Sequence, residues 1–442
     1  MQIKISEHFD YNKLFRFSLP SICMMIFSSI YGVIDGMYVS NCVGKSAFTA
    51  VNLAMPILMI IAAVGFMIGS GGSALVSKTL GEGDKERANR IFSMLILFSV
   101  FLGIILTVVG FLVLKPALIW FGAEGDTLIY GLEYGYILIP SLTFFILLNE
   151  FQSFFICAER PKLGLLAMVL TGATNIVLDT FLVAIFPLGI KGAAIATVIA
   201  QFVGAIVPLI YFARKNTSLL RLCKPIFSIR ALVKTCTNGS SEFLTNVSLA
   251  FVNMLYNYQL MEYIGDDGVS AFGVTNYVNF IFIAIILGFS LAIAPVVSYH
   301  YGAKNHEELK NLRRRCLRII FFLNISLFAL TLILAYPMSY IFVGYDSALF
   351  DITLKAFFLY SPAFLVVGYN IFSSAFFTAL NDGATSAILS TLRTLVFPTI
   401  CLLLLPKLFS VTGIFISSAV AETIALGISI MFLVIKRKRF NY

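Results

Sequence analysis

Long apolar runs, separated by short polar segments, recur along the whole chain. Each run holds at least about 20 residues, which is the length that an α-helix needs to cross about 30 Å of hydrocarbon with some tilt. The pattern predicts an all-α integral membrane protein with twelve transmembrane helices, at about 14–40, 49–77, 91–114, 130–157, 162–186, 190–212, 232–262, 270–300, 316–343, 352–379, 384–405 and 411–435.

The second half of the chain repeats the first. SALVSKTLGEGDKERANRIF at 73–92 resembles APVVSYHYGAKNHEELKNLRRR at 294–315, which places Gly81 over Gly302. Further matches occur in the same order along both halves: SAFTAVN (46–52) with SAFGVTN (270–276), and Gly192 with Gly413. Because matched loops as well as matched spans recur, a chance likeness of apolar segments is the weaker interpretation.

Six crossings return a chain to the side where it started, so the two repeats have the same orientation. Parallel repeats of this kind place a substrate cavity between two lobes near the midplane of the membrane. The polar, basic segment RKNTSLLRLCKPIFSIRA separates the repeats. We therefore expect an N-terminal six-helix lobe at 1–213, a cytoplasmic linker at 214–231 and a C-terminal six-helix lobe at 232–442.

Most of the 31 Lys and Arg residues fall in loops on one side of the predicted spans. Positively charged loops stay in the cytoplasm. The pattern therefore places both termini in the cytoplasm and the protein, as a multi-pass chain, in the cell membrane. The basic groups that decide this lie at about 4–16, 78–90, 160–162, 214–234, 304–318 and 436–439.

The composition excludes several other classes of protein. Hydrophobic residues make up 59% of the chain and charged ones 12%. The net charge of +9 lies in loops and not on a soluble face, so it does not indicate nucleic-acid binding. The seven cysteines lack C-x-x-C spacing and the three histidines do not cluster, so we expect no disulfide framework, no structural metal and no cofactor. The predicted spans contain no pair of a nucleophile and a base that would indicate an intramembrane enzyme.

Two aspartates inside predicted spans are the main functional candidates. A carboxylate in a spanning helix costs about 2.5–3.5 kcal/mol on insertion scales, so it is rarely kept without a partner, a proton or a cation. Asp35 lies in the first span and Asp179 in the fifth, where Asn175 is on the same helical face. If the aspartates meet, they would share a proton or a Na⁺, with Asn175 and Thr197 supplying oxygen atoms. The alternative is that they only cap or pair within a polar core.

Other polar and aromatic residues could line a pocket. Glu242 lies near the inner end of its span, where substrate contact, a gate and a capping role all remain open. Arg393 and Glu422 are intramembrane charges for which mutual pairing is favoured over exposure to the cavity. The remaining pocket candidates are Asn149 and Gln152 in the fourth span, Gln201 one turn after Thr197, and Tyr31 and Tyr256 at the lobe interface.

The chain resembles the multidrug and toxic compound extrusion (MATE) family over essentially its whole length. The residues that carry the resemblance are Pro20, Asp35, NIVLD (175–179), KGAAIAT (191–197) and the paired LGEGD and YGAKN loops. The resemblance implies that Asp35 and Asp179 hold a proton or Na⁺ with help from Asn175 and Thr197. It also implies that Asn149 and Gln152 line this pocket and that the first helix bends at Pro20.

The expected function is therefore antiport: H⁺ or Na⁺ enters while lipophilic, mostly cationic drugs leave by alternating access between two lobes of a monomer. Aromatic and Met side chains at the lobe interface suit flat cations. The alternative is a flippase for lipid-linked saccharides of the same broad superfamily. That activity would favour a more strongly cationic cavity, and Arg393 is the only buried cation that the sequence predicts.

Overall fold

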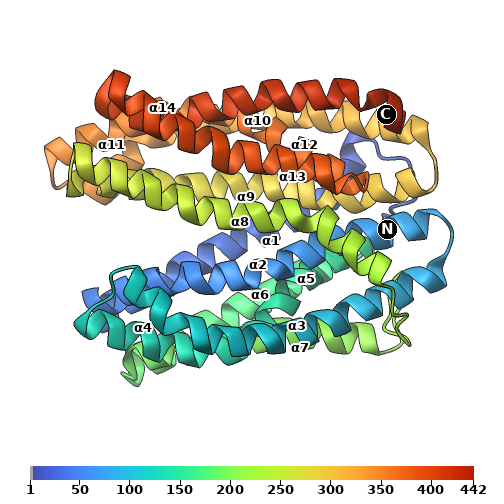
Figure 1. Ribbon diagram of the computed structural model, residues 1–442, viewed down its shortest axis with the longest axis horizontal. Coiled ribbons are helices and arrows are strands. Elements are labelled where there is room, and N and C mark those ends of the chain that lie inside the picture. Colours follow the sequence, from blue (N-terminus) through green and yellow to red (C-terminus); the bar gives the residue numbers. More distant parts are fainter. Residues whose placement is uncertain (1–2) are drawn as a thin grey trace.

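The computed structural model describes residues 3–442, apart from the side chains of Val33 and Lys45, and these residues fold into long helices that run side by side (Figure 1). The first half of the chain forms α1 (Tyr11–Tyr38), the π-helical segment η1 (Val39–Val43), α2 (Lys45–Gly81), α3 (Lys85–Trp120), α4 (Gly125–Leu138), the short 3-10 turn η2 (Ile139–Ser141), α5 (Leu142–Cys157), α6 (Pro161–Asp179), the π-helical segment η3 (Thr180–Ile185) and α7 (Gly189–Ala213).

The second half of the chain forms a second bundle beside the first. Figure 1 shows the blue-to-green helices in one half of the molecule and the yellow-to-red helices in the other, with both termini at the same end. The elements are α8 (Ile229–Tyr263), α9 (Asp266–Gly302), α10 (His306–Val343), α11 (Ser347–Tyr360), the 3-10 turn η4 (Ser361–Ala363), α12 (Phe364–Ala379), α13 (Gly383–Thr391), the π-helical segment η5 (Leu392–Val396), α14 (Phe397–Ile435) and α15 (Arg437–Phe440).

The helices confirm the predicted membrane fold. Ten helical stretches of the described chain are long and apolar enough to cross a membrane. One of them, Gly383–Ile435, is bent at Ser410, whose φ of 50° is not helical, so it supplies two crossings. The membrane-length helix α8 is too polar to be recognised by hydropathy and supplies the remaining one. Together these segments give the twelve expected spans.

Each predicted six-helix unit ends in a hairpin that is tight because a glycine allows it. A Cβ atom on Gly192 would lie 2.6 Å from the Leu182 carbonyl oxygen, and one on Gly413 would lie 2.2 Å from that of Leu405. Neither position has room for a side chain. The sequence alignment of Gly192 with Gly413 therefore pairs two residues that serve the same purpose in the two halves.

The two halves touch closely at the end that carries the termini. A Cβ on Gly81 of α2 would lie 2.0 Å from the carbonyl oxygen of Tyr299 on α9, and a Cβ on Gly302 of α9 would lie 2.1 Å from that of Lys78 on α2. These contacts are reciprocal, as a two-fold relation between the repeats requires. The repeated loop motifs thus bring the two lobes together, backbone against backbone.

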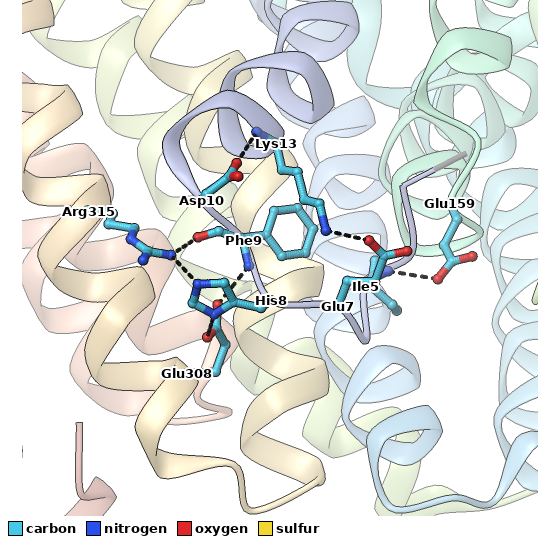
Figure 2. Close-up of polar contacts among 9 residues, drawn as sticks. All are labelled: Ile5, Glu7, His8, Phe9, Asp10, Lys13, Glu159, Glu308 and Arg315. Atoms are coloured by element: carbon cyan, nitrogen blue, oxygen red, sulfur yellow. Dashed lines mark hydrogen bonds and ion pairs between the residues drawn. The ribbon is translucent and has the colours of Figure 1, made fainter. Parts of the chain in front are cut away.

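The segment before α1 joins the two halves at the same end (Figure 2). The backbone N–H of Ile5 donates to the Glu159 carboxylate, just after α5, at 2.7 Å. The N–H of Phe9 donates to the Glu308 carboxylate on α10 at 2.9 Å, and Arg315 of α10 donates to the Phe9 carbonyl. The Ile5 and Phe9 side chains are fully buried. This segment, residues 3–10, is therefore a strap from one half to the other.

Candidate functional site: a buried pair of aspartates

Asp35 and Asp179 lie on neighbouring helices of the first half. Asp35 is in the last turns of α1, and Asp179 is the last residue of α6, which packs against both α1 and α7. The hydroxyls of Tyr38 and Thr180 hydrogen-bond at 2.8 Å, and these residues follow Asp35 by one turn and Asp179 by one position. This bond joins the two helices at the level of the aspartates.

The carboxyl groups face a polar centre and not the lipid. Asp35 is 5% exposed and Asp179 is fully buried. Asp179, Asn175 and Thr197 all contribute to the electrostatic environment of Asp35. Three of the four carboxylate oxygens, Asp35 Oδ1 and both of Asp179, are buried without a hydrogen-bond partner in the described chain. Two such groups cannot both remain ionised in a low dielectric unless a cation lies between them.

Asn175 and Thr197 complete the oxygen-rich centre. Both are buried, and the Asn175 side-chain N–H group donates to the Thr197 hydroxyl at 3.4 Å. The Thr197 hydroxyl donates in turn to the Ala193 carbonyl at 3.0 Å. The amide oxygen of Asn175 is buried and unpartnered. The arrangement thus offers carboxylate, amide and hydroxyl oxygens, the ligand type that suits a hard cation, and it also suits a shared proton.

A cavity of about 180 Å³ opens beside this centre, inside the first half. Its lining combines the predicted polar residues with apolar side chains of α2, α4, α5 and α6. Five residues predicted for the site line it: Tyr31, Asp35, Asn149, Thr197 and Gln201.

The other polar candidates of the first half hold this lining in place. Gln152 is buried and donates to the Asn149 side-chain oxygen at 3.3 Å, while Asn149 donates to the Phe145 carbonyl at 2.9 Å. The Gln201 side-chain oxygen accepts a hydrogen bond from Ser141 at 2.6 Å. Gln152 therefore orients Asn149 from behind the cavity wall.

Sequence reasoning missed Tyr134 on α4. Its side chain is fully buried, its hydroxyl has no hydrogen-bond partner in the described chain, and Asp35, Asp179 and Thr197 contribute to its electrostatic environment. The signal in the sequence was weak, because a tyrosine in an apolar run is also typical of a membrane interface. Its flanking residues Gly131 and Gly135, which pack on α3 leucines, were the available clue.

Sequence reasoning also missed the π-helical segments. Segment η1 begins four residues after Asp35, η3 begins directly after Asp179, and η5 contains Arg393. Single π-helical turns occur frequently at functional sites. In this chain each of the three lies at an intramembrane charge.

Three further candidates lie away from the aspartate pair. Tyr256 is in the second half and lines a different cavity. Glu242 is half-buried on α8, where Arg393 contributes to its electrostatic environment. Pro20 lies within the continuous helix α1, directly before the point where the backbone of Ser21 meets Gly288 of α9.

A cleft of about 550 Å³ lies between the two halves, towards the end opposite the termini. It is lined by α1, η1 and α2 from the first half and by α9 from the second. The described lining residues are uncharged: Ser29, Gly32, Gly36, Met37, Ser40, Asn41, Phe48, Asn52, Tyr277, Phe280 and Ile281. Gly32 lines both the cleft and the aspartate cavity, so the two spaces adjoin. The lobes are thus closed at one end and parted at the other.

Curated relatives match nearly the full length of the chain. The multidrug export protein MepA of Staphylococcus saprophyticus is 24% identical over 444 residues, with 98% of this chain and 96% of that protein covered. MepA of Staphylococcus aureus strain MSSA476 is 23% identical, with 98% and 95% covered.

Solved structures share the fold. A MATE protein crystallised in complex with MaL6 superposes with a TM-score of 0.92 at 22% identity, and 98% of each chain is covered. An outward-facing multidrug resistance MATE family transporter gives 0.92 at 23% identity, with 98% of this chain and 97% of that chain covered. A transporter of the MOP superfamily from Pyrococcus furiosus gives 0.91 at 23% identity, with 98% of each covered.

The family model called MatE matches two stretches of the chain, residues 20–181 and 242–403. The double match reproduces the internal repeat, and together the stretches span most of the molecule. The chain is therefore a membrane transporter of the MatE family and not an enzyme.

Proposed function

We propose that this transporter is an antiporter that exports lipophilic, mostly cationic drugs in exchange for H⁺ or Na⁺. The observation that carries the proposal is the buried pair of Asp35 and Asp179, three of whose four carboxylate oxygens lack hydrogen-bond partners, beside a cavity that adjoins the cleft. A cation that enters this pair relieves the repulsion between the carboxylates, so its arrival and departure change how α1 packs against α6. The names of the MepA relatives support multidrug export.

The cleft supports export by alternating access. With both termini in the cytoplasm, as the positive loops indicate, the parted end faces outward and the closed end faces inward. Tyr277, Phe280 and Met37 offer aromatic and thioether surfaces to a flat cation. We assign residues 1–213 and 232–442 to the two lobes, 214–231 to the linker, and a bend at Pro20 to the movement of α1. Because each cavity lies within one chain, we propose that a monomer transports.

The flippase alternative needs basic groups that hold a pyrophosphate. The described residues that line the cleft are uncharged, and the aspartate cavity carries a carboxyl group and no Lys or Arg. This lining favours the export of cationic or neutral cargo over the transfer of lipid-linked sugars.

The test uses protein reconstituted in liposomes and loaded with ethidium. An inward pH or Na⁺ gradient, each imposed separately, should drive ethidium export by the wild type, and Asp35→Asn should abolish the driven component. Asp351→Asn, which alters an exposed carboxylate on α11, is the matched control and should transport normally. Unchanged ion-driven export by Asp35→Asn would refute the assignment.

A further inference from the structure

A second cavity, of about 150 Å³, lies within the C-terminal half of the molecule. It is bounded by α8, α9, α11, η4, α12, η5 and α14. It shares no lining residue with the aspartate cavity, but Phe280 lines both it and the cleft, so the two spaces adjoin. Its polar lining includes Tyr256, Tyr360, Arg393, Ser418 and Glu422.

Arg393 is held from one side and is free on the other. Its Nε–H group donates to Glu422 at 2.9 Å, and the side chains of the pair are 13% and 12% exposed. The second Glu422 oxygen accepts a hydrogen bond from Asn370 at 2.7 Å. Both oxygens of Glu422 are therefore engaged, whereas the two terminal nitrogens of Arg393 have no hydrogen-bond partner in the described chain. A guanidinium presented in this way is a fork that matches a planar carboxylate.

A buried hydroxyl provides an independent sign of a ligand. Tyr256 is 6% exposed, it lines the cavity, and its hydroxyl is buried without a hydrogen-bond partner. An unpaired buried hydroxyl costs free energy unless something else accepts its proton. Tyr360 and Ser418 line the same cavity, so two further hydroxyls lie near that of Tyr256. Glu242 is within electrostatic range of Arg393 but does not line the cavity.

The walls and the volume limit the size of the ligand. The ring of Tyr256 stacks on that of Phe272 at 4.7 Å between centroids, with 13° between the planes. Phe364 adds a further ring, which meets Tyr360 edge-on. A protein cavity of about 150 Å³ accommodates one benzene-sized ring. Aromatic walls around donors that lack an acceptor therefore fit a single ring that carries an anionic group.

We propose that this second-lobe cavity binds a small, single-ring aromatic carboxylate. The carboxylate accepts hydrogen bonds from the terminal nitrogens of Arg393 and from the Tyr256 hydroxyl, and the ring packs against Tyr256 and Phe272. The site differs from the proposed coupling site in its lobe, its residues and the charge of its ligand. Its ligand is therefore additional to the cationic cargo proposed above.

The experiment measures binding of radiolabelled benzoate to the purified full-length protein by equilibrium dialysis. Wild type should bind benzoate saturably at one site per chain, and benzyl alcohol, which has the ring without the charge, should compete at least about tenfold less well. Tyr256→Phe removes one donor to a charged acceptor and should weaken binding by about tenfold or more.

Arg393→Lys keeps the positive charge beside Glu422 but loses the planar fork, so it should weaken benzoate binding at least about tenfold. Arg393→Met combined with Glu422→Gln leaves no unpaired charge and should abolish binding, even if one of the single variants folds poorly. Asp35→Asn, which should stop ion-driven transport, should leave benzoate binding unchanged, so the two proposals fail separately. Absence of saturable binding to the wild type, or equal binding by the double variant, would show that Arg393 and Glu422 form a structural pair only.

Discussion

A single methyl group at Gly239 should force the closed end of the transporter apart. Gly239 lies on α8, where it faces α2, and a Cβ there would lie 1.9 Å from the Met67 carbonyl oxygen. Real Cβ contacts are essentially never shorter than 3.0 Å, so the two backbones must separate. The atoms that this Cβ would meet belong to the Met67 backbone, so no flexible side chain can turn away. Gly239→Ala therefore acts directly on the contact between the two lobes.

The magnitude follows from the clash alone. Overpacking of this kind costs about 1–3 kcal/mol, and only in the conformation in which these helices touch. The gain of about 0.5–1 kcal/mol from replacing a helical glycine by alanine applies to both conformations, because α8 stays helical as the lobes move, so it cancels from their ratio. Gly239→Ala should therefore reduce the population of the closed conformation relative to the inward-open one by about 5- to 150-fold.

The assay is double electron–electron resonance between spin labels at Lys85 and Lys304, two exposed positions on either side of the closed end. Labels are placed in a cysteine-free background. Gly239→Ala should add a longer distance to the wild-type distribution. Gly273→Ala on α9 is the matched control, because a Cβ there meets nothing within 4 Å. An unchanged distribution for Gly239→Ala, or an equal shift for Gly273→Ala, would refute the reasoning.

Three further predictions concern charges. Glu308→Ala should release the strap at residues 3–10 and accelerate its proteolysis in the purified protein, and an unchanged cleavage rate would contradict the strap's dependence on that carboxylate. Glu422→Ala should lower stability by about 3–5 kcal/mol in thermal unfolding because it leaves Arg393 buried and unpaired, whereas replacing both residues by neutral ones should cost much less. Burial alone would raise the pKa of Asp382, but the hydrogen bond from Thr385 and the ammonium of Lys436 outweigh it and hold that pKa below its usual value. The ion pair with Lys436 therefore stabilises the protein above the ordinary pKa of aspartate, near 3.9, and this contribution is lost as the pH falls through the lowered value. Lys436→Met should lower the melting temperature more at pH 7 than at pH 2.5, and an equal effect at both would contradict the assignment.

The transmembrane architecture could be predicted because apolar length is a local property of the chain. The polar helix α8 was predicted as a span at 232–262, and the structure has it at Ile229–Tyr263, although hydropathy alone does not recognise it. The final hairpin was predicted at 405–411, and the structure places its bend at Ser410. The π-helical segments could not be predicted, because their extra residue depends on packing against neighbouring helices.

The candidate site could be predicted where the sequence places a charged residue inside an apolar segment, because burying such a charge is unfavourable. Asp35 and Asp179 stand out because a carboxylate in an apolar run requires a partner, a proton or a cation. The structure brings the two residues to one polar centre. The preferred pairing of Arg393 with Glu422 is seen, although both also line a cavity. Tyr134 was missed because a tyrosine is unremarkable in an apolar helix until its hydroxyl is seen to lack a partner. Whether the Tyr134 hydroxyl has a hydrogen-bond partner is decided by tertiary packing, so the sequence does not show it.

Ion binding to the purified protein tests most directly whether the aspartate pair powers transport. Proton release is recorded in weakly buffered solution, and binding of radioactive Na⁺ by dialysis, while tetraphenylphosphonium is added. We predict that the wild type binds H⁺ or Na⁺ and gives it up as the organic cation binds, and that Asp35→Asn combined with Asp179→Asn does neither. Retention of the full ion exchange by this double variant would contradict the central claim.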